Sequence, residues 1–106
     1  MKRYEIRWTD FDPTRGAEMA KRRPAVIVSP DVLNRVLETV TVCPLTTSTH
    51  PRWRSRVQVR CAGRPAEIAA DQIRTVSKSR LGERIGALNA DQAAELRRVL
   101  REMYGE

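Results

Sequence analysis

The fold of this chain is decided by an uninterrupted apolar run, PAVIVS at residues 24–29. A run of this kind, without alternating polar residues, is typical of a strand that is buried on both faces. Shorter strand-like segments, alternating or rich in β-branched residues, lie around it at residues 4–9, 39–45, 54–60, 68–70 and 84–88. The sequence therefore predicts five or six short strands, with residues 24–29 at the centre of the sheet.

Two helices and one helical turn are expected between and after these strands. Ser29 as N-cap and Pro30 at the first position predict a short helix that ends near Arg35. A single helical turn is expected at residues 77–81. Asn89 and Gln92 form a capping-box pattern, which predicts a C-terminal helix. Its apolar residues recur at helical spacing and are expected in the core: Ala93, Leu96, Val99, Leu100 and Met103.

The length of 106 residues fits one domain that spans residues 1–106. No apolar run is long enough to cross a membrane, and no signal segment follows the N-terminus, so we expect a cytoplasmic protein. Cys43 and Cys61 lie outside any zinc or redox motif and are expected to be reduced, half-buried residues. An α+β, mainly β fold is predicted: a small barrel-like sheet closed by the C-terminal helix.

The net charge of +7 points to an anionic partner. Arginine supplies 17 of the 20 basic residues, and its planar fork matches phosphate oxygens in pairs. Residues 39–66 contain no acid but five arginines, three of which we expect to lie on one face of the strand at 54–60: Arg54, Arg56 and Arg60. Such a basic strip favours nucleic-acid binding over the alternative, an arginine-rich surface that only keeps the protein in solution.

Few side chains in the chain suit catalysis. The loop at residues 10–23 holds Asp10 and Asp12, whose spacing fits a turn at least as well as a metal site. Glu18 and Arg23 lie in the same loop. They either form a surface ion pair or act together on a phosphate, the carboxylate on a proton and the guanidinium on the phosphorane charge. Thr46 and Thr47 follow a strand, where a hydroxyl can meet a phosphate oxygen, although β-propensity alone explains them. His50 is the single histidine.

Three blocks resemble the MazF/PemK (ChpA-type) toxins, in the order and spacing of that family. They are WTDFDPTRGAE at 8–18 followed by RPAVIVSP at 23–30, then VCPLTT at 42–47, and ADQIRTV at 70–76. The first of these resembles the opening of the family, the second its third strand and the last a late strand. The match covers nearly the whole chain, and its first block is the most specific. The resemblance implies an SH3-like barrel that forms a homodimer. It also implies a sequence-selective, metal-independent endoribonuclease, the toxin of a type II toxin–antitoxin pair.

The resemblance also assigns residues. The family has a catalytic arginine directly before a proline, which corresponds to Arg23. Its catalytic threonine is the first of a pair of threonines, which corresponds to Thr46. Glu18 matches an acid of the family's first loop and is the candidate general base, while Gln72 matches a residue near the RNA groove. Residues expected to contact RNA are Thr14, Lys21, Arg22, Thr47, His50, Arg52, Arg54, Arg56 and Gln72.

RNA carries its own nucleophile, the 2′-OH, which explains how a site poor in histidine can cut it. An arginine guanidinium is a permanent cation in a cell and suits stabilisation of the phosphorane, so this is the role expected of Arg23. The expected products are a 2′,3′-cyclic phosphate and a 5′-OH. No metal and no cofactor are expected.

The expected partners are single-stranded RNA (mRNA, and also rRNA or tRNA), a MazE-like antitoxin with an acidic tail, a second copy of the chain, and operator DNA through the antitoxin complex. Two other interpretations remain open: a basic barrel that binds nucleic acid without cutting it, and a CcdB-like gyrase poison. The Arg23-Pro24 and Thr46-Thr47 blocks favour the ribonuclease.

Overall fold

The computed structural model describes residues 1–13, 16–18 and 21–105. In this part of the chain, seven strands, two α-helices and two single 3₁₀ turns follow one another. Their bounds are β1 (Glu5–Asp10), β2 (Arg22–Ile27), α1 (Asp31–Val36), β3 (Thr39–Thr46), β4 (Arg56–Cys61), β5 (Arg64–Ala69), η1 (Ala70–Gln72), β6 (Arg74–Ser77), η2 (Lys78–Arg80), β7 (Leu81–Ala87) and α2 (Ala90–Tyr104).

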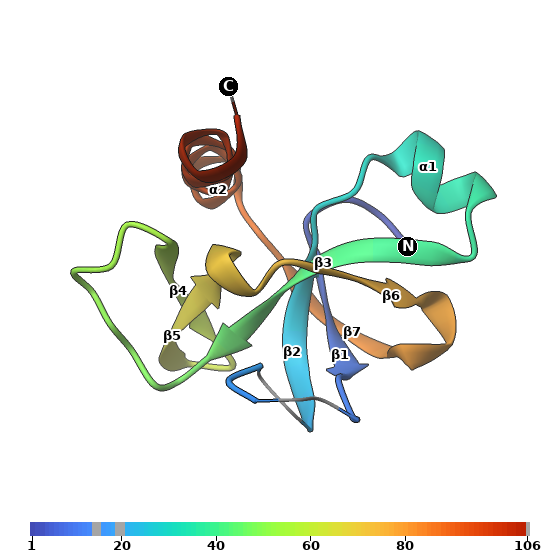
Figure 1. The fold of residues 1–106 in the computed structure, drawn as a ribbon, viewed down its shortest axis with the longest axis horizontal. Coiled ribbons are helices and arrows are strands. Elements are labelled where there is room, and N and C mark those ends of the chain that lie inside the picture. The colour runs from blue at the N-terminus through green and yellow to red at the C-terminus, as the bar shows by residue number, and fades with distance from the viewer. Residues whose placement is uncertain (14–15, 19–20, 106) are drawn as a thin grey trace.

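The strands form one antiparallel sheet in the order β4-β5-β3-β2-β1-β7, with β6 on β3. β3 is the strand on which the sheet is built, because it pairs with three others. β2 pairs with β3 in the register Ala25↔Pro44. The first half of β3 pairs with β6, and the last two residues of β3 pair with β5. This branching lets the sheet curl, so that β4 and β5 lie on one side of β3 and β6 on the other (Figure 1). The mainly β, α+β fold is as predicted.

The apolar run at residues 24–29 is buried on both faces, as predicted. Val26 and Val28 lie in a core cluster that also holds Leu96 and Val99 of α2. Ala25 and Ile27 point the other way, into a second cluster with Val40 and Val42 of β3. Because successive strand residues alternate in direction, only a strand with cores on both sides is apolar throughout.

α2 begins at the predicted capping box. Asn89 Oδ1 accepts a hydrogen bond from the Gln92 amide at 2.8 Å, and Gln92 Oε1 accepts one from the Asn89 amide at 2.9 Å. Ala93, Leu96 and Val99 are buried against the sheet, with Leu100 and Met103 packed beside them. Four of the five residues of the predicted core face therefore lie in or against the core cluster, and the fifth, Ala93, is buried as well.

Two local predictions were wrong. The N-cap of α1 is Pro30, not Ser29, and no side chain caps it. The Ser29 hydroxyl is used elsewhere: it donates to Asn34 Oδ1 at 2.5 Å and accepts from the Thr41 amide at 3.1 Å. The strand expected at 68–70 ends at Ala69, and the next residues form the turn η1 before a further strand, β6. Periodicity did not indicate a strand at residues 74–77, because four residues carry little of it, but β6 begins within the block at 70–76 that resembles a late strand of the toxin family.

Candidate active site

A hollow of about 450 Å³ opens where β2 begins and β3 ends. Arg23 lies two residues before Ala25, and Thr46 lies two residues after Pro44, the residue with which Ala25 pairs at this end of the β2–β3 ladder. Both residues line this hollow, which is called the Arg23–Thr46 hollow below. Its other lining residues are Trp8, Lys21, Arg22, Pro24, Leu45, Thr47, Cys61, Ala62, Arg64, Ala66 and Ile85.

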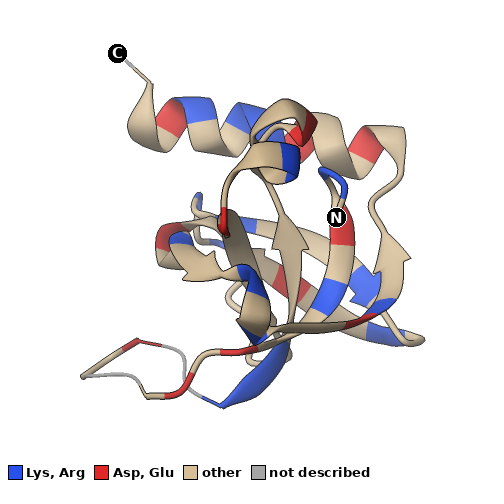
Figure 2. Ribbon diagram, turned by 90° about the vertical axis from the view of Figure 1, so that its right-hand side faces the viewer, with Lys and Arg blue, Asp and Glu red and all other residues tan. Residues whose placement is uncertain are grey.

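The hollow has a basic side and an apolar side. Three consecutive basic residues, Lys21 to Arg23, mark the start of β2 (Figure 2). Arg64 adds a fourth, while Trp8, Leu45 and Ile85 supply apolar surface. None of its described lining residues carries a carboxylate. Such a hollow suits an anion that is attached to an apolar, flat group.

Arg23 and Arg22 are held by the β1–β2 ladder. Arg23 pairs with Thr9 and Arg22 with Asp10. The Arg22 guanidinium carbon lies 5.3 Å from the centroid of the Trp8 ring, a distance at which the ring attracts the cation. Arg23 is half-buried and Arg22 exposed. The two guanidiniums therefore project from a rigid strand and not from a loose loop.

Thr46 is held even more firmly, because it is 6% exposed and ends β3. Its Oγ1 accepts a hydrogen bond from the Ser48 amide at 3.1 Å. A threonine hydroxyl has one donor hydrogen besides its acceptor lone pairs, so this bond occupies an acceptor and leaves the O–H to donate. Thr46 is thus set up to donate to an oxygen in the hollow, and Thr47 lies next to it, exposed.

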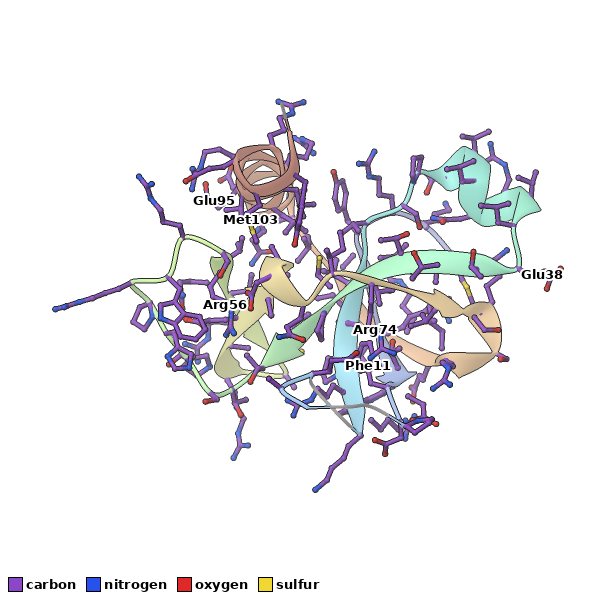
Figure 3. The ribbon with its side chains drawn as sticks, in the orientation of Figure 1. Phe11, Glu38, Arg56, Arg74, Glu95 and Met103 are labelled. Atoms are coloured by element: carbon purple, nitrogen blue, oxygen red, sulfur yellow. The ribbon has the colours of Figure 1, made fainter. Side chains whose placement is uncertain are left out.

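Glu18 does not line the hollow. It is exposed in the β1–β2 loop, where its Oε2 lies 3.7 Å from Arg74 Nη1. The Arg74 guanidinium also lies 5.3 Å from the centroid of the Phe11 ring (Figure 3). The pairing predicted between Glu18 and Arg23 is therefore replaced by one with Arg74. Thr14, another predicted RNA contact, falls outside the described residues, and Gln72 is half-buried in η1 and is not one of the residues that line the hollow.

The predicted row of positive charge along β4 is wrong at Arg56. The Arg54 side chain is 89% exposed, but that of Arg56 is only 5% exposed. Arg56 Nη1 lies 3.2 Å from Glu67 Oε1, and its Nε donates to Asp71 Oδ1 at 2.9 Å. Alternation correctly separated Arg56 from Val57, but the face that carries Arg56 is covered at this end of the strand. Arg56 is therefore a structural ion-pair partner.

Glu67 is the important residue that the sequence analysis missed. Its side chain is fully buried, and it pairs with Thr46 across β5 and β3. The carboxylate accepts hydrogen bonds from the His50 amide at 2.7 and 2.8 Å and from Gln58 Nε2 at 2.6 Å, besides the Arg56 contact. Burial raises the pKa of Glu67, but the hydrogen bonds from Gln58, His50 and Arg56 outweigh it and hold the pKa below its ordinary value. The available signal was one acid within the apolar run at 66–70, beside an arginine-rich strand.

The loop between β3 and β4, residues 47–55, carries the remaining predicted contacts. His50 and Arg52 line a second, smaller hollow of about 280 Å³ together with Thr49, Pro51 and Trp53. The structure thus brings together Lys21, Arg22, Arg23, Thr46 and Thr47, and places His50 and Arg52 on the neighbouring loop. Arg54 follows on the same loop, with its Nε 3.5 Å from Glu102 Oε1 of α2.

Both cysteines are free thiols. Cys43 is fully buried, not half-buried as expected, and burial raises its pKa to about 12. Cys61 is half-buried, as expected. Among residues 1–13, 16–18 and 21–105, no three His, Cys, Asp or Glu side chains are grouped so that they would hold a metal ion. Over the same residues, no helix has the length and apolar character needed to cross a membrane.

Comparisons with known proteins identify the family of the chain. Residues 2–104 match the model of the family described as PemK-like, MazF-like toxin of type II toxin-antitoxin system. The endoribonuclease MazF9 of Mycobacterium tuberculosis is 32% identical over 110 residues, which cover 95% of this chain and 93% of that protein.

Solved structures of MazF proteins also superpose on this chain. MazF from Deinococcus radiodurans is 30% identical and superposes with a TM-score of 0.86, over 100% of this chain and 97% of that chain. A MazE–MazF structure from the same organism is 26% identical and superposes with a TM-score of 0.80, over 100% of this chain and 97% of that chain. The chain belongs to the PemK-like, MazF-like family of toxins of type II toxin–antitoxin systems.

Proposed function

We propose that this chain is an endoribonuclease toxin that cuts single-stranded RNA at the Arg23–Thr46 hollow. The observation that carries the proposal is that Arg23 of β2 and the buried Thr46 at the end of β3 line the same hollow, together with further basic side chains. The relatives named endoribonuclease MazF support the same activity. We propose that residues 1–106 act as one domain, in the cytoplasm where RNA is available.

In the proposed reaction the 2′-oxygen of the RNA forms a bond to the adjacent phosphorus, and the bond from phosphorus to the 5′-oxygen breaks. The 2′-OH loses its proton to the solvent, and the leaving 5′-oxygen takes a proton from the solvent, which gives a 2′,3′-cyclic phosphate and a 5′-OH. Arg23 stabilises the extra negative charge of the phosphorane, and the Thr46 hydroxyl donates to a phosphate oxygen. We do not assign the first proton transfer to Glu18, because its carboxylate faces Arg74 outside the lining residues.

We further propose two protein partners. A MazE-like antitoxin with an acidic segment fits the net charge of +7, and the MazE–MazF structure from Deinococcus radiodurans supports a partner of this kind. On the family resemblance alone, we propose that two copies of the chain form a homodimer, and that the antitoxin complex binds operator DNA.

The first test is RNA cleavage in excess chelator. Because the proposed step uses an arginine and a threonine and no metal ion, a long RNA incubated with the protein and EDTA should still be cut, with 2′,3′-cyclic phosphate ends. Activity that EDTA abolishes and magnesium restores would contradict the mechanism. Intact RNA under all conditions would favour a module that only binds nucleic acid, and gyrase-linked DNA breaks would favour a gyrase poison.

The second test separates catalysis from binding at Arg23. Arg23→Ala should lower the single-turnover cleavage rate by about 10²–10³-fold, the scale for loss of one preorganised donor. Affinity for an uncleavable 2′-O-methyl RNA should fall far less, because Lys21, Arg22 and Arg64 remain. Arg23→Lys should recover part of the rate, since it keeps the charge but not the planar fork.

Thr46 offers a matched pair for the same assay. Thr46→Ala should slow cleavage strongly, whereas Thr46→Ser keeps the hydroxyl and should be milder. If rate and affinity fall by the same factor in Arg23→Ala, Arg23 only binds RNA and the catalytic assignment is wrong. Circular dichroism and thermal melting must first establish that each variant is folded, because Arg23 precedes a buried strand.

The third test contrasts Arg54 with Arg56. Removing the exposed Arg54 should flatten the dependence of log affinity on log salt by about 0.7, the contribution of one phosphate on a single strand. Arg56→Ala should leave Glu67 as an unpaired buried charge and lower the free energy of unfolding by about 3–5 kcal/mol. Titrations with uncleavable RNA at several salt concentrations, beside urea unfolding, measure both effects. An Arg56→Ala protein of wild-type stability with a flattened salt slope would make Arg56 an RNA ligand after all.

A further inference from the structure

The tip of the β4–β5 hairpin forms one edge of the Arg23–Thr46 hollow, and it carries an arginine that no step of the proposed reaction uses. Cys61, Ala62 and Arg64, at this tip, line the hollow together with Arg23 and Thr46. We propose that Arg64 is an RNA-binding residue that holds a backbone phosphate next to the scissile one. The inference rests on the proposed ribonuclease function.

The hairpin ends in a regular two-residue turn. The pairing of β4 with β5 continues as far as Cys61↔Arg64, so only Ala62 and Gly63 connect the two strands. Both have a positive φ, 52° and 77°, as in the type I′ turns that match the twist of a hairpin. The ladder therefore fixes the backbone of Arg64, and only its side chain has to become ordered when RNA binds.

Arg64 lies on the apolar face of the hairpin. Residues that pair directly across two antiparallel strands share a face, and so do residues two apart along one strand. The face of Arg64 therefore also holds Cys61, Ala66 and Ile68, and the last two are buried in the core. Cys61 and Ala66 line the hollow as well as Arg64, so this row of side chains passes from the core into the hollow. The charge at the end of the row is thus presented to the hollow.

The Arg64 guanidinium is available to an anion. Arg64 is exposed, and within residues 1–13, 16–18 and 21–105 its side chain has no hydrogen bond and no ion pair. Lys21 and Arg22 line the same hollow, and none of its described lining residues is an acid. An anion that enters the hollow therefore meets positive charge from both β2 and β5, and the fork of an arginine suits phosphate oxygens in particular.

The β3–β5 register relates Arg64 to the cleavage position. Thr46, at the end of β3, pairs with Glu67 of β5. Arg64 lies three residues nearer the tip of the hairpin than Glu67, which at about 3.3 Å per residue is about 10 Å along the strand. Thr46 and Arg64 are therefore placed to meet two phosphates of one RNA strand, the scissile phosphate at Thr46 and a neighbouring phosphate at Arg64.

Such a contact acts on binding and not on the chemical step. A phosphate that does not react carries the same charge in the ground state and in the transition state, so Arg64 stabilises both equally. The contact positions the RNA in the hollow without reading its bases. Arg64 is thus a binding residue in this proposal, whereas Arg23 is a catalytic one.

Arg60 offers a matched control on the same hairpin. It is exposed like Arg64, but it pairs with Pro65 and so lies on the opposite face. Its Nη2 donates to the Gly63 carbonyl at 2.7 Å, and it does not line the hollow. Arg60→Gln and Arg64→Gln therefore remove the same charge from the same hairpin, and only Arg64→Gln removes a cation from the hollow.

Binding of an uncleavable 2′-O-methyl RNA tests the proposal. Arg64→Gln should weaken affinity by about 10-fold, the scale of one hydrogen bond to a charged group, and should flatten the dependence of log affinity on log salt by about 0.7. Arg60→Gln should change affinity by less than about 2-fold, because an exposed charge outside the hollow is screened. In single-turnover cleavage at saturating protein, Arg64→Gln should keep the wild-type rate.

A methylphosphonate scan locates the phosphate. Each RNA of the series carries one neutral methylphosphonate in place of a phosphate. The wild-type protein should lose about 10-fold in affinity at one linkage next to the cleavage position, whereas Arg64→Gln should show no further loss at that linkage. Thermal melting shows whether each variant is folded. Arg64→Lys, which keeps the charge and should recover part of the affinity, serves if Arg64→Gln is unstable.

Four outcomes would overturn the proposal. Equal losses in Arg64→Gln and Arg60→Gln would mean that only net charge matters, and unchanged affinity of Arg64→Gln would remove Arg64 from the path of the RNA. Coupling of Arg64 to the scissile linkage alone, or a lower rate at saturating protein, would place it on the reacting phosphate. A wild-type protein that neither binds nor cuts RNA would refute the ribonuclease function itself, whereas cleavage with an unaffected Arg64→Gln variant refutes only this contact.

Discussion

A carboxylate that is removed from water must be met by hydrogen bonds and positive charge, and in this protein that requirement falls on Glu67. It is fully buried and faces Thr46 across β5 and β3. Its partners come from β4, through Arg56 and Gln58, and from the β3–β4 loop, through the His50 amide. Arg56 extends the network to Asp71 in η1. One buried ion pair thereby fixes the end of β3 and the loop that follows it.

This constraint explains how a small sheet can present chemistry at a strand end. The Thr46 hydroxyl is positioned by β3, whose neighbour Glu67 cannot move without losing its partners. Arg23 is positioned by the β1–β2 ladder on the other side of the hollow. The groups that we propose to react therefore lie on strands, and not on the longer loops. In the proposed reaction RNA supplies the nucleophile, so placement of a cation and a hydroxyl donor is the main demand on the protein.

The features that were predictable from sequence are those set by local periodicity. The run at residues 24–29 indicated a strand with cores on both faces, and Asn89 with Gln92 indicated the start of α2, because both depend on near neighbours in the chain. Arg56 and Glu67 were not predictable in this way. Alternation says that Arg56 and Val57 point in opposite directions, but not that η1 and β5 supply acids on the side of Arg56. The partner of Glu18 also depends on how the β1–β2 loop lies relative to β6. Arg23 and Thr46 were identified by family resemblance, since their spacing in the chain alone allowed plain structural roles.

The central claim is that the scissile phosphate lies between Arg23 and Thr46. The most direct measurement is a crystal structure of the unmodified chain with an uncleavable RNA that carries 2′-O-methyl groups around the mapped cleavage position. The proposed site requires a phosphate oxygen of that linkage within about 3.2 Å of Thr46 Oγ1 and of a guanidinium nitrogen of Arg23. A complex in which that phosphate lies on another surface, for example against Arg74 and Glu18, with no phosphate in the Arg23–Thr46 hollow, would contradict the account.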